Sequence, residues 1–138
     1  MIELFTSAGA LILLDQLSKN LAHRNLLGRS VAWGPVLRLR YVVHAERHHE
    51  HAGARVALVV VWFAALFSVI LLHRHGPWFE TSIATLGLGL ALGGAAGNLL
   101  DIVRLRHIVD FIDLRWWPVF NLADVAIVGG LTVALWYR

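Results

Sequence analysis

Two aspartates near the end of the chain have a spacing that would suit acid–base chemistry. Asp124 is the sixth residue of the apolar run 119–136, and Asp110 lies in the more polar segment before that run. A carboxylate within a membrane segment costs ~2.5–3.5 kcal/mol on insertion scales, so it marks a candidate functional site. The segment between them is short enough to return Asp110 to the start of the run. Two unrelated interfacial carboxylates would show the same spacing.

Two carboxylates that meet in a partly dry site cannot both ionise easily, so they would share a proton. One would act as a general base on a water molecule, and the other as an acid toward a carbonyl oxygen. This is aspartic protease chemistry, which requires neither a metal nor a cysteine. The chain has no cysteine, so thiolate catalysis is excluded.

Three further ionisable residues lie within or beside apolar runs. Asp15 and Lys19 are four residues apart in the run 4–22, so on a helix they share one face and can pair. Such a pair is either a helix-end ion pair that sets the depth of the segment or a part of the site. Asp101 directly follows the run 82–100, where we expect it to cap a helix end. It is either an interfacial residue or a site residue.

Four apolar runs must position these residues, at about 4–22, 54–72, 82–100 and 119–136. The chain is 58% hydrophobic and 15% charged, whereas soluble domains are ~45–50% apolar and ~25% charged. Each run is near the ~20 residues of a spanning helix, and the second and third lack the polar face of a soluble bundle. We predict an all-α integral membrane protein with four transmembrane helices in a single domain, 1–138. The first run lacks the features of a cleaved signal peptide, so we expect a retained span.

The connections 23–53 and 101–118 lie on the same side of a four-span protein. Residues 37–43 alternate between the two faces of a strand, and 108–112 is a second candidate strand. We therefore expect a small extramembrane β-sheet formed by the first and third connections. Gly89, Gly93 and Gly97 recur every four residues, which favours close helix packing.

A histidine cluster in the first connection raises the question of a metal. His44, His48 and His51 lie near Glu46 and Glu50, and these residues could bind a metal ion. They follow no H-E-x-x-H order, and their spacing defines no tetrahedral site. A solvated polar loop is the preferred interpretation, so we predict no metal and no cofactor.

Three segments resemble the motifs of one family, the lipoprotein signal peptidases (signal peptidase II). The segment 15–19, DQLSK, resembles D-x-x-[TS]-K. The segments 97–101 and 109–112, GNLLD and VDFI, resemble G-N-x-x-D-R followed by V-x-D-F-I. The segment 120–124, FNLAD, resembles F-N-x-A-D. The resemblance covers nearly the whole chain. It implies an intramembrane aspartyl endopeptidase that removes signal peptides from diacylglyceryl-modified prolipoproteins.

The resemblance also implies roles for particular residues. Asp110 and Asp124 would be the catalytic pair. The substrate-binding or supporting residues would be Asn98, Asp101, Asn121, Asp15, Lys19 and, in the place of a family asparagine, His44. The expected partners are a lipid-modified prolipoprotein and membrane lipid. We expect a monomer in the bacterial cytoplasmic (inner) membrane, with its active site near the outer face.

The chain departs from the family pattern at four positions. Ile102 replaces an arginine, and Arg104 lies two residues further on. Arg106 stands where the family has a glycine, and His44 and Glu46 replace an asparagine and a glycine. These departures leave two alternatives: a non-catalytic or substrate-specialised paralogue of the same fold, or a small metal-handling or transport membrane protein.

The charge distribution conflicts with the orientation that the family implies. The net charge is +3, and the arginines form no single stripe, so no nucleic-acid partner is expected. Most arginines lie in the first and third connections, and the positive-inside rule would place that face in the cytoplasm. We give the resemblance more weight, because arginines that fold against a sheet or lipid headgroups need not act as retention signals.

Overall fold

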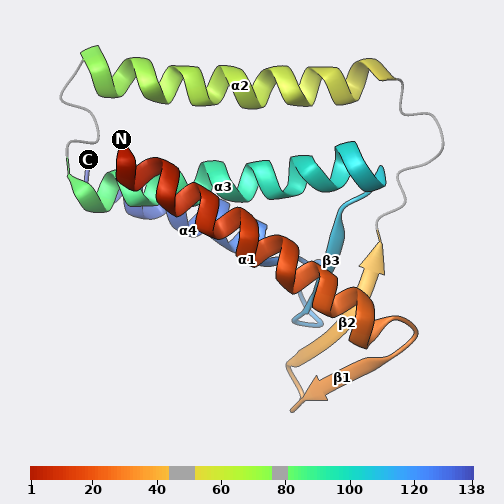
Figure 1. Ribbon diagram of the computed structural model, residues 1–138. Coiled ribbons are helices and arrows are strands. Elements are labelled where there is room, and N and C mark those ends of the chain that lie inside the picture. The colour runs from red at the N-terminus through yellow and green to blue at the C-terminus, as the bar shows by residue number, and fades with distance from the viewer. Residues whose placement is uncertain (44–51, 76–80) are drawn as a thin grey trace.

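The computed structural model describes residues 1–43, 52–75 and 81–138. Four helices lie side by side, with a three-stranded antiparallel sheet at one end and both termini at the other (Figure 1). The elements in chain order are α1 Ile2–Leu26, β1 Ser30–Trp33, β2 Leu37–Val43, α2 Ala52–His75, α3 Ser82–Leu105, β3 Val109–Asp113 and α4 Leu122–Trp136. The predicted architecture of four helices and a small sheet from the first and third connections is therefore confirmed.

The sheet has the order β1-β2-β3, so the strand from the third connection pairs with the strand predicted at 37–43. A bulge between Leu39 and Val42 interrupts this pairing, and Val42 then lies opposite Asp110. Bulges are common next to functional sites because they redirect side chains. The first strand, β1, was not predicted, because four residues between turns carry too short a pattern.

Two expectations about helix ends are wrong. Asp101 does not cap the end of a helix, because α3 continues to Leu105 and ends where Arg106 adopts the left-handed conformation (φ 64°). Asp124 is the third and not the sixth residue of the last helix, because α4 begins only at Leu122, with Asn121 as its N-cap. Phe120, which belongs to the apolar run, instead forms an isolated bridge with Ile112 of β3. Both aspartates thus lie near the sheet end of the helices.

Glycines bring α1, α3 and α4 into close contact, as the spacing of Gly89, Gly93 and Gly97 predicted. A Cβ at Gly93 would lie 2.6 Å from the carbonyl oxygen of Ala8 on α1, and one at Gly94 would lie 2.5 Å from that of Ala123 on α4. Helix α3 is therefore the central helix of the three, with glycines facing both neighbours. On α2, the indole nitrogen of Trp62 donates a hydrogen bond of 3.2 Å to the carbonyl oxygen of Leu92 on α3.

Among the described residues, α3 is the one helix that is both long and apolar enough to cross a membrane by length and composition. Val60–Leu71 and α4 are shorter apolar helices. Exposed leucines nevertheless line α1, including Leu13 and Leu17, which are 66% and 58% exposed. Four transmembrane helices remain a prediction.

Candidate active site

A buried ion cluster joins α1 to α3. The ammonium of Lys19 lies 2.8 Å from a carboxylate oxygen of Asp15 and 2.8 Å from one of Asp101. All three side chains are buried, and Asp15 is 0% exposed. We call Asp15, Lys19 and Asp101 the Lys19 cluster. The pairing predicted from the spacing of Asp15 and Lys19 is present, but it lies within the helix packing and not at a helix end.

Each carboxylate of the Lys19 cluster also accepts hydrogen bonds from other elements. Asp15 Oδ1 accepts from the backbone nitrogen of Ala123 at 3.1 Å, which ties α1 to the first turn of α4. Asp101 Oδ1 accepts from Gln16 Nε2 at 2.9 Å. Gln16 also donates to the carbonyl oxygen of Gly97 at 3.2 Å. Gln16 stands at a variable position of the D-x-x-[TS]-K motif, and its role depends on a backbone carbonyl that only the folded chain brings near.

Two asparagines connect this cluster to the predicted catalytic pair. Asn98 Oδ1 accepts a hydrogen bond of 2.9 Å from Lys19, and Asn98 Nδ2 donates one of 2.9 Å to Asp124. Asn121 Nδ2 donates to Asn98 Oδ1 at 3.0 Å and to Asp110 Oδ1 at 2.7 Å. A continuous polar network therefore runs from α1 through α3 to both aspartates.

Asn121 brings the two aspartates together. Its amide donates to Asp110, and its backbone nitrogen donates to Asp124 Oδ2 at 3.1 Å. The backbone nitrogen of Asp124 donates to Asn121 Oδ1 at 3.0 Å, which completes a reciprocal capping box at the start of α4. Asp110 is 7% exposed, and Asp124 is half-buried. Among the described residues, no buried side-chain nitrogen or oxygen lacks a hydrogen-bond partner.

An apolar cavity of about 330 Å³ lies next to Asp124. Its other lining residues are apolar and come from the β3–α4 connection and from α4: Leu114, Trp116, Trp117, Phe120, Val125 and Val128. A carboxylate at the edge of an apolar cavity could meet a substrate whose flanking groups are hydrophobic.

A second ion cluster lies outside the network, on the sheet. Asp113 Oδ2 accepts hydrogen bonds from Arg38 at 2.6 and 3.0 Å and from Arg40 at 2.6 Å. Hydrogen bonding to Arg38, followed by that to the backbone nitrogen of Arg115, lowers the pKa of Asp113 from 3.8 to about 2. We call Arg38, Arg40 and Asp113 the Asp113 cluster. It holds β3 to β2 at the end of the strand away from Asp110.

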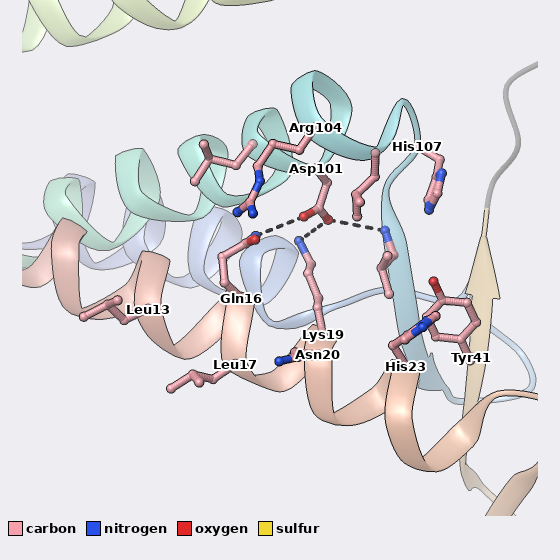
Figure 2. Close-up of a pocket in the computed structure, with 13 residues that line it drawn as sticks. Leu13, Gln16, Leu17, Lys19, Asn20, His23, Tyr41, Asp101, Arg104 and His107 are labelled. Atoms are coloured by element: carbon pink, nitrogen blue, oxygen red, sulfur yellow. Dashed lines mark hydrogen bonds and ion pairs between the residues drawn. The ribbon is translucent and has the colours of Figure 1, made fainter.

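The structure also places Arg104 and two of the positions that depart from the family pattern, Ile102 and Arg106. Arg104 lines a cavity on the α1 side of α3, together with Gln16 and Lys19 (Figure 2), and Ile102 does not line it. Arg106 has a φ of 64°, a conformation that favours glycine, which accounts for the family's glycine there. His44 and the other histidines of the cluster lie outside the described residues. Within the described residues, no three metal-ligating side chains come together.

Comparison with known proteins defines the family. The family model described as signal peptidase (SPase) II matches residues 7–138. A lipoprotein signal peptidase of Moorella thermoacetica is 39% identical over 131 residues, covering 89% of this chain and 83% of that protein. One of Halothermothrix orenii is 34% identical over 131 residues, covering 91% and 88%. The chain belongs to the signal peptidase II family.

The fold also agrees with solved structures. A bacterial membrane enzyme determined by the in meso method at 1.9 Å resolution superposes with a TM-score of 0.79 at 20% identity, covering 97% of this chain and 90% of that one. A second bacterial membrane enzyme structure, at 2.3 Å, gives a TM-score of 0.77. At this level of identity the likeness concerns the fold.

Proposed function

We propose that this chain is an aspartyl endopeptidase that removes signal peptides from diacylglyceryl-modified prolipoproteins. Membership of the signal peptidase II family supports the reaction. The observation that carries the mechanism is the position of Asn121, which donates hydrogen bonds to both Asp110 and Asp124. Because one asparagine contacts both carboxylates, they would share a site that holds a water molecule and the peptide carbonyl.

In the proposed reaction one aspartate is ionised and the other is protonated. The ionised carboxylate takes a proton from water as the water oxygen bonds to the peptide carbonyl carbon, and the protonated carboxyl gives its proton to the carbonyl oxygen. The resulting gem-diol then collapses. The C–N bond breaks, the amine nitrogen receives a proton from the aspartate that had taken one, and the new carboxyl group returns a proton to the other.

The supporting residues of this proposal act by position. Asn98 and Asn121 hold the two carboxylates, and Lys19 fixes the carbonyl oxygen of Asn98. The Lys19 cluster in turn fixes α1 against α3 and α4. The apolar cavity beside Asp124 would accept a hydrophobic part of the substrate near the cleavage point. Four membrane-spanning helices would place the sheet at the outer face of the cytoplasmic membrane. A lipid-modified substrate held in the bilayer would then meet the two aspartates near that face.

A cleavage assay with matched aspartate variants tests the mechanism. Asp110→Asn and Asp124→Asn should each lower the cleavage of a diacylglyceryl-modified prolipoprotein by roughly a thousandfold or more, because an amide can neither accept nor return the proton. Asp113→Asn is the matched control, since it makes the same change three residues from Asp110 outside the network, and it should leave most activity intact. A well-folded wild-type protein that cleaves no such substrate would contradict the proposal and favour the alternative of a non-catalytic paralogue.

The orientation has its own test. The substitution Arg29→Cys introduces a single cysteine between α1 and β1. It should react with an impermeant thiol reagent that reaches only the outer side of the cytoplasmic membrane. Labelling that requires permeabilisation of that membrane would place the sheet in the cytoplasm, as the arginine count suggests.

A further inference from the structure

A cavity of about 550 Å³ lies on the α1 side of α3, between these helices and strands β2 and β3 (Figure 2). Neither Asp110 nor Asp124 lines it, so the proposed reaction does not use it. Lys19 and Asp101 of the Lys19 cluster, together with Gln16, form its floor. The cavity therefore borders the polar network at Lys19 and Asp101 without reaching Asp110 or Asp124.

The charged groups at the floor already have partners within the protein. Asp101 accepts hydrogen bonds from Gln16 and Lys19, and its Oδ2 also lies 3.4 Å from the backbone nitrogen of Val109 (Figure 2). Lys19 contacts both Asp15 and Asp101. Because Lys19 is held between two carboxylates, it offers no free cation to an anionic ligand.

The rim is different, since it carries basic and donor groups near the ends of α1 and α3. Arg104 is exposed, and it has no ion-pair partner among the side chains that the structure describes. His23 and Tyr41 lie edge to face, with ring centroids 5.2 Å apart, and His107 completes the rim. Burial and the nearby Asp101 raise the pKa of Tyr41, so its hydroxyl remains a donor.

The wall along the helices is mostly apolar, although Asn20 of α1 also lines the cavity. Leu13 and Leu17 of α1 are 66% and 58% exposed, and Leu100 and Leu105 of α3 face the same cavity. A basic rim directly above exposed leucines suits a ligand with an anionic head and hydrocarbon chains. A free phosphate would use the rim alone and would leave the leucines without a partner.

We propose that this cavity binds the phosphate of an anionic membrane phospholipid, with Arg104 as its main partner. The acyl chains would lie along Leu13 and Leu17, in the direction of the helix axes. The inference rests on the membrane placement in the proposed function, but not on the peptidase chemistry. It assigns a role to Arg104, which the predicted network does not use.

Native mass spectrometry of delipidated protein in detergent micelles tests the proposal. The probes are phosphatidylglycerol, phosphatidylcholine with the same acyl chains, and glycerol 3-phosphate. Wild-type protein should retain phosphatidylglycerol about tenfold more strongly than either of the others, because only it combines a net negative phosphate head with acyl chains. Arg104→Gln should remove most of this preference, and Arg104→Lys should keep part of it.

Arg24→Gln is the matched control, because Arg24 is an exposed arginine near the end of α1 that does not line the cavity. If Arg104→Gln and Arg24→Gln lose equal amounts of phosphatidylglycerol retention, the lipid is held by a general attraction of charges, and the proposal is overturned. Equal retention of phosphatidylcholine, or glycerol 3-phosphate binding as tight as phosphatidylglycerol, would overturn it too. Selective lipid retention by a protein that cuts no prolipoprotein would contradict the proposed function and leave this site intact.

Discussion

The Lys19 cluster and the Asp113 cluster each pair carboxylates with cations, but their surroundings differ. In the first, the side chains of Asp15, Lys19 and Asp101 are at most 5% exposed. In the second, the side chains of Arg38 and Arg40 are 35% and 40% exposed, although Asp113 itself is buried. Water and salt can screen the second cluster and not the first.

This fold divides its charged clusters between two tasks, helix packing and strand alignment. The Lys19 cluster lies where glycines allow three helices to approach, so each of its atoms must find a partner inside the protein. The Asp113 cluster lies at a sheet edge, where it aligns β3 with β2. The buried cluster should therefore be intolerant of change, and the sheet cluster should be tolerant.

Loss of the lysine should have the largest effect on stability. Lys19→Met leaves the carboxylates of Asp15 and Asp101 without a cation in a buried site, which should lower the free energy of unfolding by about 3–5 kcal/mol. Unfolding in detergent micelles measures this change. Arg24→Met, which removes an exposed cation from the same helix, should change stability by less than about 1 kcal/mol. Similar values for the two variants would mean that the Lys19 cluster is screened like a surface pair.

A substitution that forces α1 away from α3 should have the next largest effect on stability. A Cβ at Gly97 would lie 2.5 Å from Asp15 Oδ2 and 3.1 Å from Asp15 Cγ. Lys19 and the backbone of Ala123 hold that carboxylate in place, so Gly97→Ala should cost about 1–3 kcal/mol. Gly129→Ala is the matched control, since a Cβ there meets nothing within 4 Å. Equal thermal stability of the two variants in micelles would show that Asp15 moves freely and that the packing is loose.

Sequence reasoning located the parts of the site that depend on local spacing. The pairing of Asp15 with Lys19 follows from helix geometry, and the alternation at 37–43 identified β2 with the bounds that the structure has, Leu37–Val43. The short third connection also predicted correctly that Asp110 returns to the start of the last helix, where Asn121 now contacts it.

The parts that sequence reasoning missed depend on contacts between distant elements or on a helix cap. Hydropathy placed the start of the last helix at residue 119, because Val119 and Phe120 are apolar. The capping box of Asn121 and Asp124 instead begins the helix at Leu122, and an Asn followed three residues later by an acidic residue could have indicated this start. No local pattern could have shown that Gln16 contacts Asp101, which is 85 residues away.

The smallest effect is expected at the Asp113 cluster, and it should depend on pH. The pKa of Asp113 is lowered from 3.8 to about 2 in the folded protein, so its charge stabilises the fold above pH ~4 and this contribution is lost as the pH falls through about 2. Asp113→Asn should lower the Tm by less than Gly97→Ala does. The difference from wild type should be constant at neutral pH, shrink between pH ~4 and ~2, and decrease in high salt.

Glu3→Gln, at an exposed position on α1, should show no such difference. A Tm difference that persists at pH 2, or that salt leaves unchanged, would mean that Asp113 is shielded from water and salt as the Lys19 cluster is.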